Sequence, residues 1–188
     1  MYGKTSTKDL IASVMSKKYK TLKTKGNYNN GIGLPLTVLS IKDEDAAVIE
    51  MGMNHLGEIS RLAKIARPTI GVITNVGTAH IGNLGSRENI LKAKLEMLEG
   101  MAENAPLVIN NDNDMLHNWY LENKGTRKII TFGIENESDV MAKNIDLGED
   151  GSKFEVKIYD EIYNAKINVR RKSFCDKCIM CDSCGNSK

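Results

Sequence analysis

Short apolar runs alternate with amphipathic segments along most of the chain. Four runs rich in Val and Ile have the length and nearly continuous apolar character of strands buried on both faces: residues 46–51, 70–75, 106–110 and 128–132. Apolar residues at helical spacing predict helices at residues 8–17, 59–66, 87–99 and 115–123. Helices that alternate with strands in this way are typical of a parallel sheet with helices packed on its faces.

The pattern changes at residues 140–169. Apolar and polar residues alternate there, and the segment 148–151, Gly-Glu-Asp-Gly, has the composition of a tight turn. We therefore expect an α/β three-layer sandwich, with a mostly parallel sheet and a small antiparallel excursion near residues 140–169.

Length and charge narrow the class of protein. A chain of 188 residues has the length of about one domain, and its 26 basic and 24 acidic residues are dispersed along it. No single-sign cluster favours nucleic acid or a membrane surface. The sequence has no apolar run of about 18 residues and no basic-then-apolar leader, so we expect a cytoplasmic protein with no membrane segment.

A phosphate-binding motif stands at the start of the chain. Gly3, Lys4, Thr5, Ser6 and Thr7 match the closing half of G-x-x-x-x-G-K-[ST]. Such a loop offers backbone N–H groups at a helix N-terminus, a lysine charge for the β- and γ-phosphates, and a hydroxyl for Mg²⁺. Only Met1 and Tyr2 precede it, so we expect a chain that lacks the opening half of its loop. Because so short a match can arise by chance, an ordinary solvated turn remains an alternative.

Three further residues stand out, and the first two have chemistry suited to cations. Glu50 ends an apolar run, where a carboxylate can bind a hard cation, and His80 follows the next run. Lys94 lies in Lys-Ala-Lys-Leu-Glu at residues 92–96. Taken singly, each has a plain alternative: a strand-end acid, a loop histidine and a charged helix face.

The order of these segments matches a known family. The matching stretches are Gly-Lys-Thr-Ser-Thr-Lys at 3–8, Thr-Lys-Gly-Asn-Tyr-Asn-Asn-Gly-Ile-Gly-Leu-Pro-Leu-Thr at 24–37, Glu-Met-Gly at 50–52, His-Leu-Gly-Glu-Ile at 55–59, Ile-Thr-Asn-Val-Gly at 73–77, Ala-His at 79–80, Gly-Ser at 85–86, Ala-Lys-Leu-Glu at 93–96 and Asn-Asn-Asp-Asn at 110–113. Over roughly residues 3–169 the chain resembles the central ATPase domain of the Mur ligases, and within that family the branch that adds D-alanyl-D-alanine. The sheet would then be of the P-loop type.

The resemblance implies ATP-dependent amide formation in peptidoglycan precursor synthesis. The terminal carboxylate of a UDP-N-acetylmuramoyl-tripeptide would take the γ-phosphoryl group of ATP, and the amine of D-alanyl-D-alanine would then displace phosphate. Charge neutralisation and positioning dominate such chemistry. The implied cofactors are ATP and Mg²⁺, and the implied protein is a monomer.

The resemblance also implies roles for single residues. Catalysis would fall to Lys4, His80 and Lys94, with Lys4 on the β- and γ-phosphates, and Lys94 matches a lysine that the family carbamylates. Gly3, Lys4, Thr5 and Ser6 would bind the phosphates, and Asn110 the adenine. The metal ligands would be Thr5 and Glu50 for one Mg²⁺, and His80 and carbamylated Lys94 for a second. Asn27, Asn29 and Asn30 would face the muramoyl-peptide, while Asn75 would be structural.

Residues 170–188 do not continue the resemblance. They carry four cysteines in the spacing Cys-x-x-Cys-x-x-Cys-x-x-Cys at 175–184, which in principle binds Zn²⁺ or an iron–sulfur cluster. Permissible codons shifted by one base after residue 169 can encode the linker and helix that the family has there, so we favour a frameshifted tail. We expect two regions: an N-terminally truncated ATP-binding domain at 1–169, and a cysteine-rich, disordered or frameshifted tail at 170–188.

Three functions follow as hypotheses. The first is a D-alanyl-D-alanine-adding ligase truncated at both ends, whose fragment alone we expect to be inactive. The second is another Mur-type ligase with a different amino-acid acceptor. The third, from another class, is a non-catalytic metal-binding module that uses the cysteine tail.

Overall fold

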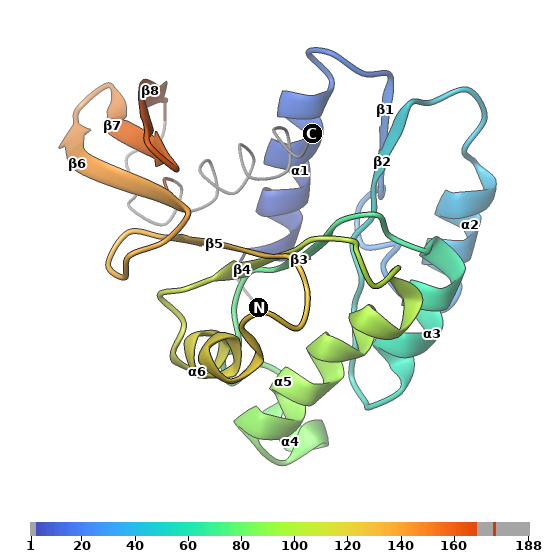
Figure 1. The fold of residues 1–188 in the computed structure, drawn as a ribbon. Coiled ribbons are helices and arrows are strands. Elements are labelled where there is room, and N and C mark those ends of the chain that lie inside the picture. The colour runs from blue at the N-terminus through green and yellow to red at the C-terminus, as the bar shows by residue number, and fades with distance from the viewer. Residues whose placement is uncertain (1–2, 169–174, 176–188) are drawn as a thin grey trace.

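The computed structural model describes residues 3–168 and residue 175 (Figure 1). The helices are α1 (Lys4–Met15), α2 (Gly33–Leu39), α3 (Glu58–Ala66), α4 (Ile81–Leu84), α5 (Arg87–Leu95) and α6 (Asp114–Asn123), with a 3-10 helix η1 (Glu96–Gly100). The strands are β1 (Thr21–Lys23), β2 (Ala46–Val48), β3 (Gly71–Ile73), β4 (Leu107–Asn110), β5 (Ile129–Gly133), β6 (Val140–Gly148), β7 (Gly151–Ile158) and β8 (Glu161–Ile167). No helix in these ranges is long and apolar enough to cross a membrane.

The larger sheet has the strand order β3-β4-β5-β6-β7-β8. Strands β3 to β6 pair in parallel, and β6, β7 and β8 form an antiparallel meander that turns between Gly148 and Gly151. The predicted fold class and its antiparallel excursion are thus confirmed. The parallel strands are, however, divided, because β1 and β2 form a separate two-stranded parallel sheet.

Strand β4 lies between two apolar clusters. Its Leu107 and Ile109 belong to a cluster with residues of α3, α5 and α6, while Val108 belongs to a second cluster with residues of β5, β6 and β7. All three side chains are fully buried, as the alternation of side chains along a strand with both faces covered requires. Figure 1 shows α5 and α6 on one face of this sheet and α1 on the other, which gives the three predicted layers.

Several element boundaries differ from the sequence expectation. Helix α1 begins at Lys4 rather than residue 8, because Gly3, with φ of 137°, makes the turn into the helix and the motif residues form its first turn. The segment 87–99 is divided into α5 and η1. Strand β1 and helix α2 were not predicted. In α2, Leu34 is buried in the core and Val38 packs against it, but the helix has only seven residues and exposes Leu36 and Leu39, so its apolar stripe is too short for the pattern to reveal.

Helix α3 and η1 pack very closely at two small residues. Ala63 is fully buried, and a Cβ atom added at Gly100 would lie 2.7 Å from the Cβ of Ala63 and closer still to its carbonyl group. A backbone neighbour cannot move aside as the end of a flexible side chain can. The small residues therefore set the spacing between α3 and the segment that continues α5.

We expect Gly100→Ala to lower the free energy of unfolding by about 2 kcal/mol through overpacking. Gly82→Ala is the matched control, because Gly82 lies in α4 and a Cβ there meets no other atom within 4 Å. The control should leave stability unchanged or raise it by up to about 1 kcal/mol through helix propensity. Urea unfolding followed by circular dichroism measures both. Equal stability of the two variants would contradict the close packing.

Candidate functional site

A polar cavity of about 270 Å³ lies where α1 begins and where the loops after β1 and β2 meet His80. Its lining includes Lys4, His80 and the predicted asparagines Asn27, Asn29 and Asn30. The carboxyl ends of β1 and β2 and the N-terminus of a helix thus meet at one point, the usual ligand position in α/β folds. Residues predicted from distant parts of the sequence are therefore brought together here.

Glu50 is held rigidly at the end of β2. Its backbone N–H donates to Thr24 Oγ1 at 2.9 Å, and its Oε1 accepts a hydrogen bond from Asn29 Nδ2 at 2.8 Å. The side chain is only 7% exposed, yet Oε2 has no hydrogen-bond partner among the described residues. A buried carboxylate oxygen without a partner is costly, and a bound cation would satisfy it.

Lys4 extends from the first turn of α1 toward the same place. Its Nζ donates to the carbonyl oxygen of Met51 at 3.0 Å. Burial lowers the pKa of Lys4, and the charge of Glu50 acts against that shift. The ammonium group is thus placed next to the carboxylate and beside the cavity, where it can meet an anion.

His80 and Lys94 add two basic groups. His80 has left-handed backbone geometry, with φ of 69°, and its Nε2 is buried without a partner in the described part of the chain. Burial lowers the pKa of His80, and the charges of Lys4 and Lys94 lower it further, which favours the neutral imidazole, the form that can bind a metal. Burial, and then the charge of Lys4, lower the pKa of Lys94 to about 8.

Two of the three predicted asparagines also have structural contacts. Asn29 donates to Glu50 and its carbonyl oxygen accepts from Gly52 N at 2.6 Å, which joins the loop to the end of β2. Asn30 Oδ1 accepts from the backbone N–H of Ile32 and Gly33 and so begins α2. Asn27 lines the cavity.

The remaining predicted residues lie around this cluster. Asn110, at the end of β4, donates to the carbonyl of Thr74 at 3.2 Å and accepts from Asp112 N at 2.9 Å, so its amide fixes the loop after β3. Gly3 is the N-cap of α1, with Ser6 in the same turn. Thr5 is exposed, and no contact between Thr5 and Glu50 is recorded within residues 3–168. Asn75 accepts from Asn113 at 2.8 Å, as a structural residue would.

Sequence reasoning missed some residues at the site. Thr7 Oγ1 is buried without a partner inside the described ranges, although the motif drew attention to the earlier hydroxyls. Glu58 and Arg61, one turn apart on α3, also line the cavity. Glu58 accepts from the N–H of Asn54 and His55, which lowers its pKa.

Comparison with known proteins agrees with this geometry. The family model of the Mur ligase middle domain matches residues 2–172. The chain belongs to the Mur ligase family. This Mur ligase middle domain is 42% identical over 156 residues to the UDP-N-acetylmuramoyl-tripeptide–D-alanyl-D-alanine ligase of Bacillus subtilis, covering 82% of the chain and 33% of the relative. The ligase of the same name from Synechocystis is 48% identical over 134 residues, or 71% of the chain and 29% of the relative.

Solved structures of the family superpose closely on the chain. A crystal structure of MurF from Acinetobacter baumannii has a TM-score of 0.89 at 29% identity, covering 97% of this chain and 40% of that protein. MurF ligase from Thermotoga maritima in complex with ADP has a TM-score of 0.86 at 31% identity, covering 98% of this chain and 42% of that protein. The Mur ligase middle domain described here spans about a third of the length of the curated relatives it matches.

The tail predicted at residues 170–188 lies outside the described residues, except for Cys175. Cys175 is fully buried and belongs to the second apolar cluster, with Val108 and Phe132. Within the described part of the Mur ligase domain, no three His, Cys, Asp or Glu side chains come together as a metal site.

We expect Lys4→Met to raise the pKa of Lys94 above about 8, because it removes the nearby positive charge. Lys92→Met, two residues away and on the exposed face of α5, should leave that pKa unchanged. An NMR titration of the lysine ¹³Cε signals measures both. The pKa of Lys94 is below the ordinary 10.5, so this group's contribution to stability should rise as pH increases from about 8 to 10.5. An identical Lys94 titration in the two variants would contradict the arrangement.

Proposed function

We propose that this chain is the nucleotide-binding middle domain of a UDP-N-acetylmuramoyl-tripeptide–D-alanyl-D-alanine ligase, and that it binds ATP with Mg²⁺. The curated relatives named above carry this activity in their names, and a structural relative is described in complex with ADP. The observation that carries the proposal is the buried Glu50 oxygen without a partner, beside Lys4. Because the chain covers only about a third of the length of these relatives, we propose the complete reaction for the whole ligase and not for this part alone.

In the proposed reaction the terminal carboxylate of the tripeptide attacks the γ-phosphorus of ATP, and ADP leaves. The amine of D-alanyl-D-alanine then attacks the acyl carbon, and phosphate leaves as the amide forms. Lys4 would neutralise the β- and γ-phosphates from the helix N-terminus. Glu50 and His80 fit as Mg²⁺ ligands because Glu50 Oε2 and His80 Nε2 are buried and without partners in the described ranges. Bound Mg²⁺ would neutralise charge on the phosphates.

Lys94 suits the carbamylation that the family resemblance implies. Carbon dioxide reacts with the neutral amine, and a pKa of about 8 leaves a substantial neutral fraction near pH 7.5. The carbamate replaces a positive charge with a negative one. Since Lys4 is the charge that lowers the pKa of Lys94, the carbamate would gain an attractive partner there.

The loop at residues 27–31 and Asn54 would face the muramoyl-peptide across the cavity. The same name in both curated relatives favours D-alanyl-D-alanine over another amino-acid acceptor. No observation on the described residues favours the metal-binding module, because Cys175 is buried among apolar side chains. We further propose that the protein acts as a monomer in the bacterial cytoplasm.

Nucleotide binding tests the first part of the proposal. We expect titration calorimetry to detect ATP·Mg²⁺ binding, and Glu50→Gln to weaken it by about tenfold or more by removing the carboxylate charge while keeping the contact with Asn29. Glu44→Gln is the control, because Glu44 is half-buried, does not line the cavity and accepts from Lys42 N. If the 188-residue chain does not bind ATP in the presence of Mg²⁺, the proposal is overturned for this chain.

Binding of the second substrate tests the loop. A Cβ at Gly52 would lie 2.7 Å from Asn29 Oδ1, whereas a Cβ at Gly31, in the same cavity, meets nothing within 4 Å. We expect Gly52→Ala to weaken binding of UDP-N-acetylmuramoyl-tripeptide severalfold, because it displaces Asn29, and Gly31→Ala to have little effect. Fluorescence anisotropy with a labelled UDP-muramoyl-tripeptide measures both. Equal affinities of the two variants for the labelled tripeptide would show that this substrate does not bind against Asn29.

A further inference from the structure

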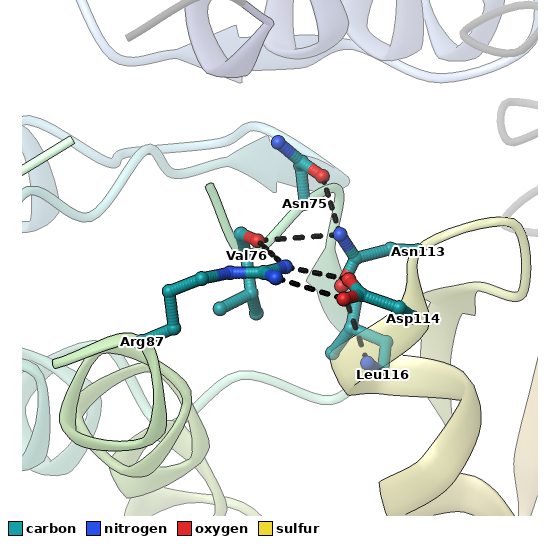
Figure 2. A network of polar contacts seen from close by, with 6 residues as sticks. All are labelled: Asn75, Val76, Arg87, Asn113, Asp114 and Leu116. Atoms are coloured by element: carbon teal, nitrogen blue, oxygen red, sulfur yellow. Dashed lines mark hydrogen bonds and ion pairs between the residues drawn. The ribbon is translucent and has the colours of Figure 1, made fainter. Parts of the chain in front are cut away.

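A polar network outside the cavity joins the starts of two helices to the loop after β3 (Figure 2). The guanidinium of Arg87 donates to both carboxylate oxygens of Asp114, at 2.8 and 2.5 Å, and to the carbonyl of Val76 at 2.9 Å. Asn113 donates to Asn75 Oδ1 at 2.8 Å and to the same Val76 carbonyl at 3.3 Å. The carbonyl of Val76 therefore accepts from Arg87 and from Asn113.

Each member of the network stands at the end of an element. Arg87 is the first residue of α5 and Asp114 the first residue of α6. Asn113 is the N-cap of α6, where its Oδ1 accepts from Leu116 N at 3.2 Å. Val76 lies three residues after the end of β3. A two-pronged contact between a guanidinium and a carboxylate fixes orientation as well as distance, unlike an ordinary surface ion pair.

The segments that leave this network lead to the candidate site. His80 follows Val76 by four residues, and Lys94 follows Arg87 by seven, which is about two helical turns and returns to nearly the same side of α5. On the other side, Asn110 donates to the carbonyl of Thr74, two residues before Val76. Arg87 therefore connects the His80 and Lys94 side of the site with the loop between β4 and α6.

We propose that Arg87 is a positioning residue that sets His80 and Lys94 relative to the Asn110 loop, and that nucleotide affinity depends on it. The proposal rests on the proposed function, because it assumes that nucleotide spans these two sides. Arg87 acts through Val76 and Asp114. Its side chain is a third exposed and is not among the residues that line the cavity.

Calorimetry with ADP·Mg²⁺ on the full chain tests this role. We expect Arg87→Gln to weaken binding about tenfold, the order of effect that coupling networks show, and Arg87→Lys to recover part of the loss, because one ammonium can keep one of the two contacts. We expect Asp114→Asn to weaken binding too. The Asp114→Asn variant distinguishes a positioning role from direct attraction of phosphate. If Arg87 attracted phosphate directly, removing the charge of Asp114 would leave ADP affinity unchanged or raise it.

Arg127→Gln is a matched control. Arg127 also donates to two backbone carbonyls, those of Ala102 and Ala105, and its Nε is likewise buried without a partner in the described part of the chain. Arg127 lies just before β5, and its contacts with Ala102 and Ala105 place its side chain near the start of β4, at the opposite end of that strand from Asn110. We expect Arg127→Gln to lower the melting temperature about as much as Arg87→Gln and to leave ADP affinity unchanged.

The outcomes separate the two proposals. If the unmodified chain fails to bind ADP·Mg²⁺, the proposed function fails first. If the unmodified chain binds but Arg87→Gln and Arg127→Gln bind equally well, Arg87 is only structural and the inference is overturned. Unchanged or tighter binding by Asp114→Asn would also overturn it.

Discussion

The parallel pairing of β3, β4 and β5 is the constraint on which the larger sheet and the loops leaving it depend. Val72 pairs with Val108, and Val108 with Ile130, so the three strands run in register and their carboxyl ends meet at one edge. Strand β4 is buried on both faces, and a one-residue slip would exchange the side chains of its two clusters. Backbone pairing and apolar packing thus fix the origin of each loop independently of the polar contacts.

The candidate site concentrates positive charge at a cost in stability. Burial lowers the pKa values of Lys4, His80 and Lys94, and the lysines disfavour charge on His80. Glu50 is the acidic group that opposes the shift of Lys4. An anion and a cation bound together would relieve both the repulsion among the basic groups and the unpaired oxygen of Glu50. The protein therefore holds its polar groups in the arrangement that a ligand needs before the ligand arrives.

The sequence predicted the strands best where apolar residues were continuous, as at 106–110 and 128–132, and these became β4 and β5. The sequence also allowed Lys4, Glu50, His80 and Lys94 to be assigned to one site, because the family resemblance implied that they lie close together. Helix α2 escaped prediction because its buried face is short, with Leu34 in the core while Leu36 and Leu39 are exposed, and because the side chain of Asn30 helps to fix its start. Arg87 escaped because Asp114 lies 27 residues away, and only the folded chain shows that two helix starts meet. The side-chain contacts of Asn110 likewise depend on the β3–β4 pairing, which no local pattern encodes.

Asn29 couples the loop at residues 27–31 to Glu50. Its side chain binds one oxygen of Glu50, and its backbone carbonyl binds Gly52, so the loop at 27–31 is attached twice to the end of β2. Any movement of that loop must either carry Glu50 with it or break a hydrogen bond to a buried carboxylate, which is among the more costly bonds to lose. The Glu50 carboxylate has Oε2 left for a further partner, and the hydrogen bond from Asn29 to Oε1 sets the direction in which Oε2 points. Because loop geometry and carboxylate orientation share one amide, a ligand that orders the loop also orients the remaining oxygen of Glu50.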